Sequence, residues 1–445
     1  MKYNQSTMKK NLIILFSAVV LAVGLSSCGI YGKFKSKTDE SIDTLKIPEC
    51  KEIFTDTYLQ ALIDTALANN LDLKIAHENV EQANATLLGA KLAYIPSVAL
   101  SPSAGWGKTS PNASPGWGVS PYGFAQASWE VDIFGRLTNR KRIANASKKQ
   151  MEDLEQASRV ELVSAVAELY YELLVLDAQI TTTDSAAVNF ERSVETMRNL
   201  KLAGLADEAA VAQFQGKYYQ CLAMSKSLRL ARVTTESAMR LLLNKSEYQI
   251  ARGGIEDAVK LPNTIQEVNM QVLRIRPDVK AAEHQLEQAF YSLNLARANC
   301  CPSISITGSL GSSAGLIFNA VGSLIQPLFN SGRNIAEVRG AKHQLKAAEY
   351  QYSKALLVAA TEVEDALASE KYYRDQESDY TNQVTAISNA LDYTLTKMRV
   401  GVGTYLEVLT AQNDLLNVQI TQIENYGDIL KAGVKLYQAI GGGKQ

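Results

Sequence analysis

Apolar residues recur with the period of an α-helix over unusually long stretches of this 445-residue chain. The segment from Thr138 to Leu200 is rich in Ala, Glu, Lys, Leu and Gln, and its apolar residues are spaced alternately by four and three positions. This heptad spacing predicts a helix that packs in coiled-coil fashion along one seam. At 1.5 Å per residue the helix would be roughly 95–100 Å long. The seam consists of Leu162, Val166, Leu169, Leu173, Leu176 and Ile180.

A second helix of similar length is predicted from Arg333 to about Arg399, in a part of the chain that contains no proline. Each long helix is followed by a short glycine-containing segment and then by a further helical pattern. These patterns predict two long helical hairpins, with tips near residues 204 and 401. The return stripe of the second hairpin consists of Tyr405, Val408, Leu409, Leu415 and Leu416.

The second tip has clear signals for the end of one helix and the start of the next. Gly401 and Gly403 interrupt the helix, since glycine is costly in a helix interior and easily takes positive φ at a C-cap. Thr404 is expected as the N-cap of the next helix, and Glu407, three residues later, would complete a capping box. An earlier version of this tip runs from Lys201 to Glu208 around Gly204.

Between the helices the hydrophobic period changes to two. Apolar and small or polar residues alternate from Val98 to Trp106 and from Ile304 to Leu310, which predicts a strand with one apolar face. Second strands are expected over 119–134 and 316–329. These lengths suit tilted strands that cross a bilayer, and Trp106, Trp117 and Trp129 would suit an interfacial aromatic belt. The alternative is two soluble hairpins packed on the helices.

The chain contains an internal duplication. Asp72 and Pro96 match Asp278 and Pro302 at an offset of 206, whereas Gly204 matches Gly401 at an offset of 197. The change in offset predicts a longer surface loop, over 108–118, in the first copy. The expected parts are a signal peptide (1–27), a lipidated linker with an equatorial segment (28–65), a first repeat (66–260, β-hairpin 97–134), a second repeat (261–440, β-hairpin 303–329) and a tail (441–445).

Four strands are too few to close a barrel, and an open strand edge cannot face lipid. A membrane role therefore requires oligomerisation. Three chains would give a twelve-stranded barrel continuous with a tube of twelve helices. The predicted fold class is accordingly mainly α with transmembrane β, and the alternative is a soluble coiled-coil rod.

The N-terminus has the pattern of a secretion signal. Lys9 and Lys10 precede an apolar segment, 12–23, that is too short to span a membrane as a helix. Leu25-Ser26-Ser27-Cys28 follows and resembles a bacterial lipobox, which implies diacylglycerol and an N-acyl chain on Cys28 as a stable anchor. In lipoproteins of this kind Gly29 favours sorting to the outer membrane. The alternative is an ordinary secretory signal with an incidental cysteine.

The composition of the chain mainly argues against certain classes of function. The chain has 45 basic and 46 acidic residues, so its charge does not suggest a nucleic-acid partner. Three histidines and five cysteines, without CxxC or HExxH spacing, do not suggest a metal site, a cofactor or an enzyme. Whether Cys50, Cys221, Cys300 or Cys301 form disulfides is left open.

Five segments stand out along the chain: 129–136, 276–283, 301–304, 326–333 and 400–412. In this order they resemble the TolC-like outer-membrane efflux lipoproteins, over nearly the whole mature chain. The resemblance implies a homotrimeric exit duct of a tripartite pump, anchored in outer-membrane lipid and reaching into the periplasm. Its implied partners are a periplasmic membrane-fusion adaptor and an inner-membrane pump of the resistance-nodulation-division type.

The resemblance also gives the tips their expected roles. Glu407, and also Asp207 and Glu208, would form a ring of carboxylates at the closed pore that favours cations. Alternatively, Glu407 only caps its helix. A type I protein-secretion duct and a structural coiled-coil lipoprotein without a pore are the alternative functions. Adaptor docking, or only the turning of the chain, is expected of Gly204, Leu205, Ala206, Gly401, Val402, Gly403 and Thr404.

Overall fold

The computed structural model describes residues 32–36, 53–108, 117–258, 270–312, 316–325 and 332–442. The chain divides into two compact units. Unit 1 combines Met1–Thr38, Glu78–Asp153 and Lys280–Ala355, and unit 2 combines Asp39–His77, Leu154–Val279 and Leu356–Gln445. Outside the described residues lie the predicted signal peptide, the predicted lipobox with Cys28, Cys50, the segment 326–331 and the predicted tail from 443 onward. Residues 109–116 of the predicted loop 108–118 also lie outside them, whereas Lys108, Trp117 and Gly118 belong to strands rather than to a loop.

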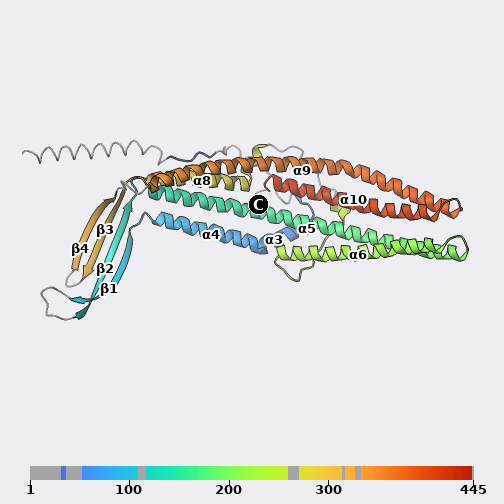
Figure 1. Ribbon diagram of the computed structural model, residues 1–445, viewed down its shortest axis with the longest axis horizontal. Helices are drawn as coiled ribbons and strands as arrows, with labels where there is room; N and C mark the ends of the chain where they lie inside the picture. Colours follow the sequence, from blue (N-terminus) through green and yellow to red (C-terminus); the bar gives the residue numbers. More distant parts are fainter. Residues whose placement is uncertain are drawn as a thin grey trace, which may run out of the picture. The chain divides into compact units, whose positions relative to one another are not determined.

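Unit 1 contains a four-stranded antiparallel sheet with the strand order β1-β2-β3-β4 (Figure 1). The strands are β1 (Ser97–Lys108), β2 (Trp117–Val131), β3 (Ser303–Ser312) and β4 (Leu316–Ile325). Each repeat contributes one hairpin, and β2 joins them by pairing with β3, with Trp129 opposite Ile306. β1 and β4 are therefore the edges of the sheet, as expected of a subunit that completes its sheet by oligomerisation.

Apolar side chains of the sheet are exposed on the single chain. Val98 and Leu100 in β1 are 73% and 80% exposed, and Ile306 and Leu310 in β3 are 45% and 44% exposed. The alternation predicted from the sequence is thus present, but these side chains are not packed on helices as the soluble alternative requires. An apolar strand face without a protein partner suits lipid.

The first hairpin ends earlier than the sequence predicted. β2 stops at Val131 rather than continuing to Phe134. The Asp132 carboxylate accepts hydrogen bonds from the backbone N–H groups of Leu137 (2.9 Å) and Thr138 (2.8 Å), so residues after Val131 initiate the next helix instead.

The long helices reproduce the duplication. α5 (Arg136–Leu202) and α9 (Arg333–Arg399) have 67 residues each, and α6 (Glu208–Leu242) and α10 (Tyr405–Ala439) have 35 each. All four pairs of bounds differ by the predicted 197 positions. α5 and α6 form one hairpin and α9 and α10 the other (Figure 1). The helices α4 (Leu71–Leu92) and α8 (Pro277–Ala298) have 22 residues each and start 206 positions apart.

Unit 2 contains the largest hydrophobic core, which gathers residues from α3 (Thr57–Asn69), α5, α6, α10 and the strap, a name used here for residues 244–258. The strap includes α7 (Ile255–Ala258), and a 3₁₀ helix, η3 (Met270–Ile275), precedes α8. Most of the predicted heptad seam of α5 is confirmed, since Val166 and Leu173 are fully buried and Leu162, Leu176 and Ile180 nearly so. Leu169, the remaining member, is partly buried against the same core. In the described part of the chain, every helix is too short or too polar to serve as a membrane span.

Candidate functional site: the helical tips

The two tips have the same backbone conformation at their central glycines. Gly204 and Gly401 both have positive φ, at 75° and 79°, which the missing Cβ of glycine permits. The N–H of Leu205 donates to the Leu200 carbonyl at 2.9 Å, and the N–H of Val402 donates to the Lys397 carbonyl at 3.0 Å. These bonds satisfy carbonyl groups at the end of each outgoing helix and turn the chain in the same way.

The return helices begin with equivalent N-caps. The Asp207 carboxylate accepts from the N–H of Ala210 at 2.9 Å, and Thr404 Oγ1 accepts from the N–H of Glu407 at 3.3 Å. Thr404 is therefore an N-cap, as predicted. The Glu407 carboxylate instead lies 3.5 Å from Nζ of Lys397, at the end of α9. Asp207 is engaged as a helix cap, which was not its predicted role.

Large apolar side chains are exposed at both tips. Leu202 and Leu205 are 86% and 76% exposed in the first tip, and Val400 and Val402 are 68% and 75% exposed in the second. Behind them lies a core formed by α5, α6 and α10, which includes Phe190, Phe214 and other residues of these helices. The tips thus combine a rigid base with an apolar surface, an arrangement typical of a protein contact.

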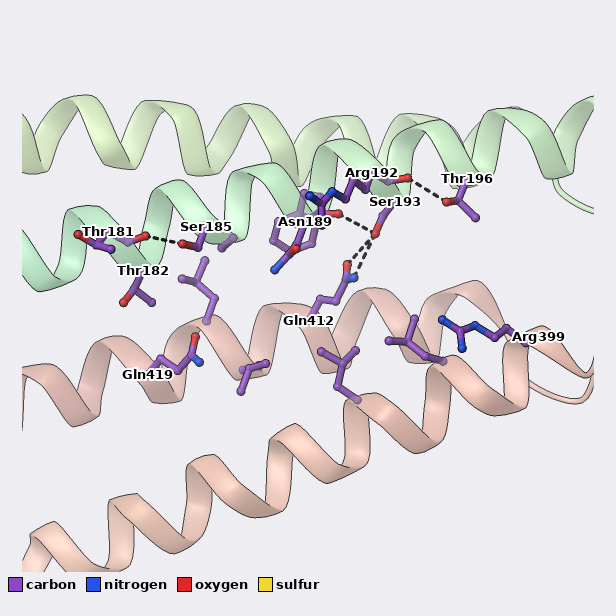
Figure 2. Close-up of a pocket in the computed structure, with 16 residues that line it drawn as sticks. Thr181, Thr182, Ser185, Asn189, Arg192, Ser193, Thr196, Arg399, Gln412 and Gln419 are labelled. Atoms are coloured by element: carbon purple, nitrogen blue, oxygen red, sulfur yellow. Dashed lines mark hydrogen bonds between the residues drawn. The ribbon is translucent and has the colours of Figure 1, made fainter.

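A polar cavity of about 610 Å³ lies behind the tips, between α5, α9 and α10 (Figure 2). The side-chain amide of Gln412 donates to Ser193 Oγ at 3.1 Å and links α10 to α5. The sequence does not reveal this cavity, because three helices form it and each helix alone shows only scattered polar residues. Its polar lining consists of Thr181, Thr182, Ser185, Asn189, Arg192, Ser193, Thr196, Arg399, Gln412 and Gln419.

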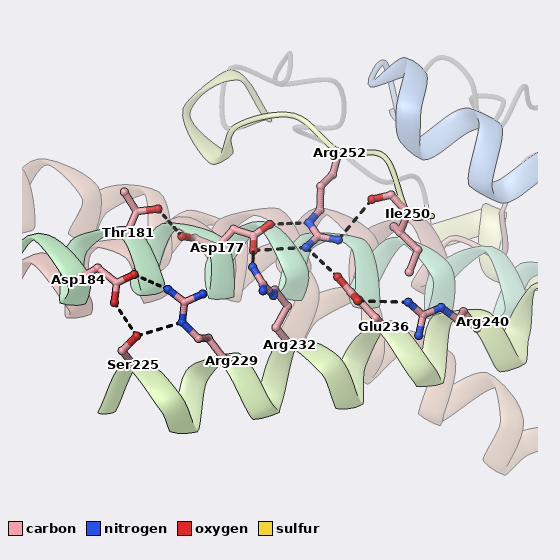
Figure 3. A network of polar contacts seen from close by, with 10 residues as sticks. All are labelled: Asp177, Thr181, Asp184, Ser225, Arg229, Arg232, Glu236, Arg240, Ile250 and Arg252. Carbon is pink, nitrogen blue, oxygen red and sulfur yellow. Dashed lines mark hydrogen bonds and ion pairs between the residues drawn. The ribbon is translucent and has the colours of Figure 1, made fainter. Parts of the chain in front are cut away.

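A second polar cluster, also missed, joins the strap to the long helices (Figure 3). Arg252 donates through Nε to Asp177 of α5 at 2.5 Å and through a terminal nitrogen to Glu236 of α6 at 3.0 Å. Asp177 also pairs with Arg232, and Glu236 with Arg240, both at 3.3 Å. Asp177 lies 75 positions before Arg252, so spacing alone gave no signal for their contact.

The remaining candidate residues are scattered. His77 pairs with Glu155 at 3.4 Å, and His284 lies 3.4 Å from Asp153 and 3.1 Å from Glu287. Burial raises the pKa of the Asp153 carboxyl to about 6. Among the described residues, no group of three or more His, Cys, Asp or Glu side chains is arranged to hold a metal ion. In the same part of the chain Cys221, Cys300 and Cys301 are free thiols.

An edge-open sheet with an exposed apolar face, joined to two matched helical hairpins, defines a subunit of an oligomeric membrane channel. The family model described as "Outer membrane efflux protein" matches residues 62–245 and 269–442. The chain belongs to this family, and the resemblance seen in its sequence is confirmed.

Individual proteins with similar sequences agree with this family assignment. The chain is 27% identical over 413 residues to the cation efflux system protein CusC of Escherichia coli strain K12, and this match covers 88% of each chain. It is 28% identical over 414 residues to the solvent efflux pump outer membrane protein SrpC of Pseudomonas putida, and this match covers 89% of this chain and 88% of that protein.

Solved structures share the fold. A crystal structure of CusC has a TM-score of 0.82 at 26% identity and covers 93% of this chain and 99% of that one. VceC of Vibrio cholerae has a TM-score of 0.79 at 22% identity and covers 90% and 100%. The predicted fold class, a trimeric outer-membrane β-barrel continuous with a helical barrel, is confirmed. The protein is an outer-membrane efflux channel that extends into the periplasm and serves as an exit duct.

Proposed function

We propose that this channel is the outer-membrane part of a tripartite pump and opens when a periplasmic adaptor docks on its helical tips. An inner-membrane pump of the resistance-nodulation-division type would supply the cargo, which we propose to be small toxic molecules. The observation that carries the proposal is the pair of matched tips with exposed apolar residues. Relatives of similar identity serve cation and solvent efflux systems, so likeness alone does not define the cargo.

The docking surface proposed here consists of the two turns. Three features support it: the shared backbone path, the exposed side chains of Leu205 and Val402, and the small residues around them that allow another backbone to approach closely. An adaptor that contacts both tips of each chain would meet six similar turns per trimer. The proposed surface comprises Gly204, Leu205, Ala206, Gly401, Val402, Gly403 and Thr404.

The proposed pore gate lies beside this surface, at Glu407. Its side chain is 43% exposed, and its N–H rather than its carboxylate takes part in the N-cap. The carboxylate therefore does not cap the helix, and it lies beside Nζ of Lys397. Asp207 is a weaker gate candidate, because its carboxylate caps α6.

We also propose that Cys28 carries the lipid anchor. Gly32–Ser36 lies on unit 1, where Arg142 donates to the Gly32 carbonyl at 3.3 Å and Ser36 Oγ donates to Glu283 at 2.7 Å. Phe34 packs against Phe290, with ring centroids 5.9 Å apart. Four residues span at most about 14 Å, so the anchor would be tied close to this contact. Mass spectrometry of the wild type and of Cys28→Ala tests this, since only the wild type should carry acyl chains.

Charged substitutions at exposed tip positions test the docking proposal. Leu205→Asp and Val402→Asp should leave the fold and the trimer intact, because both side chains are exposed, yet abolish efflux in cells that lack the natural gene. Val402→Leu keeps an apolar surface and should retain efflux. Trimer yield is measured by gel mobility without heating, and efflux by resistance to an exported compound. Full efflux by both Asp variants would contradict docking, and lost trimer would assign these residues to the fold instead.

A further inference from the structure

Lys397 and Glu407 form an ion pair across the base of the second tip. Lys397 Nζ lies 3.5 Å from Glu407 Oε2. Lys397 belongs to the last turn of α9, and Glu407 to the first turn of α10. The pair therefore connects the end of the outgoing helix to the start of the return helix.

The duplication provides an internal comparison for this pair. At the offset of 197, Leu200 and Ala210 occupy the equivalent positions in the first tip. Ala210 is fully buried, and the first tip shares with the second the bond from the turn back to the outgoing helix, from the N–H of Leu205 to the Leu200 carbonyl. A tip of this shape thus forms with two apolar residues at these positions. The first tip has its own ion pair, between Lys201 and Glu208, so the two tips place their charges at different positions.

The backbone holds Lys397 close to the turn. Its carbonyl accepts from the N–H groups of both Val402 and Gly403, each at 3.0 Å. A Cβ added at Gly403 would lie 3.0 Å from Lys397 Cβ and 3.0 Å from the Met398 nitrogen, which is closer than nearly all real contacts. Gly403 therefore permits a close approach that fixes the stem of the lysine beside the first turn of α10.

The pair contributes little to stability. The side chains of Lys397 and Glu407 are 55% and 43% exposed. Ion pairs between exposed side chains of this kind add little to the stability of a protein. The electrostatic effect on a passing ion is a separate matter. An ammonium group beside a carboxylate cancels most of the carboxylate's electric field and leaves only the field of a dipole. That weaker field dies away within the screening length, which is about 8 Å at physiological salt.

We propose that Lys397 is the counter-ion that sets the net charge at Glu407 and thereby the ion selectivity of the duct. This inference rests on the proposed placement of Glu407 at the pore. In a trimer the gate would contain three ion pairs rather than three bare carboxylates. The duct would then pass ions with little preference for either sign, and Lys397, not Glu407 alone, would determine that balance.

Reversal potentials in a salt gradient across a planar bilayer test the proposal. Lys397→Gln leaves three unpaired carboxylates and should raise the ratio of cation to anion permeability several-fold. Glu407→Gln leaves three unpaired ammonium groups and should shift the ratio toward anions. The double variant removes both charges and should return close to the wild-type ratio.

Two further variants separate this effect from a general loss of charge. Lys397→Arg keeps the positive charge and should keep the wild-type ratio. Lys431 of α10 forms an ion pair with Glu172 of α5. Lys431→Gln removes the same charge as Lys397→Gln and should change the permeability ratio less. An unchanged ratio in Lys397→Gln would overturn the inference. If efflux and conductance then remain normal, the proposed function stands without it, and a shift in Glu407→Gln alone would keep Glu407 at the pore.

Discussion

Arg252 Nε lies 2.5 Å from Asp177 Oδ2, although the two residues are 75 positions apart in the chain. The Arg252 side chain is only 14% exposed and also reaches Glu236. The adjacent N–H of Gly253 donates to the hydroxyl of Tyr170 at 3.4 Å. These contacts attach the strap to both helices of the first hairpin at one point.

Arg252→Gln should release the strap. The variant loses the contacts to Asp177 and Glu236, but both carboxylates retain a second arginine partner, Arg232 or Arg240. The expected loss is therefore about 1–2 kcal/mol rather than the 3–5 kcal/mol of an isolated buried pair. Thermal unfolding of the purified trimer measures it, and limited proteolysis should show earlier cleavage within residues 244–258.

Arg229 provides the matched control for this prediction. It pairs with Asp184 at 2.6 Å on the same two helices, but the side chains are 50% and 42% exposed. Arg229→Gln should cost less than about 1 kcal/mol. A larger loss in Arg229→Gln than in Arg252→Gln would show that the strap is held by its apolar contacts and not by Arg252.

Gly427 allows α10 to pack closely on α5. A Cβ at this position would lie 2.5 Å from Val175 Cγ2. Valine is stiff at χ1 and cannot easily turn away, so Gly427→Ala should destabilise the trimer by about 1–3 kcal/mol. Val175→Ala in the same chain removes the obstructing methyl groups. We expect the double variant to recover most of that loss in chemical unfolding experiments.

Gly433 also lies on α10, and it tests whether the steric clash with Val175 causes the loss of stability at Gly427. An added Cβ there meets nothing within 4 Å. Gly433→Ala should therefore be neutral or stabilising by about 0.5–1 kcal/mol, through helix propensity alone. Equal losses in Gly427→Ala and Gly433→Ala would contradict the steric explanation.

Asp153 should make stability depend on pH. Burial raises its pKa from 3.8 to about 6, an effect opposed by the nearby His284 and Lys280. A raised pKa in the folded state means that the contribution to stability is complete below pH 3.8 and is lost as the pH rises through 6. Asp153→Asn removes this loss and should be more stable than wild type at pH 8, by about 1–2 kcal/mol.

Unfolding temperatures between about pH 4.5 and 8 measure the effect. The advantage of Asp153→Asn should shrink as the pH falls. Glu152→Gln is the control, because Glu152 is 45% exposed and paired with Lys148 at 2.8 Å. It retains Asp153, so its stability should keep most of the wild-type fall with rising pH. Lower stability of Asp153→Asn at pH 8 would mean that the contact with His284 outweighs the burial of the charge.

Much of the fold could be predicted because its elements are long and duplicated. The offset of 197 between Gly204 and Gly401 correctly placed both hairpins, and the heptad seam of α5 identified its buried face. Strand ends were less predictable: Asp132 begins helix initiation where alternation alone favoured continuing β2 to Phe134. Side-chain capping competes with strand pairing at such a position, and periodicity does not record that competition.

The candidate site could be predicted only where it is local. Thr404 was recognised as an N-cap from a spacing of three residues. The partner of the Glu407 carboxylate was not, because Lys397 lies on the other helix of the hairpin and meets Glu407 only once the turn has formed. The same holds for Arg252, whose carboxylate partners come from two different helices.

We expect the path through this channel to pass the helical tips. Planar bilayer recordings of trimers carrying Val402→Cys test it most directly, since Val402 is exposed at the second tip. A bulky thiol reagent added on the side of the tips should reduce the single-channel current of this variant and leave the wild type unchanged. An unaltered current in Val402→Cys, with labelling verified by mass spectrometry, would contradict the claim.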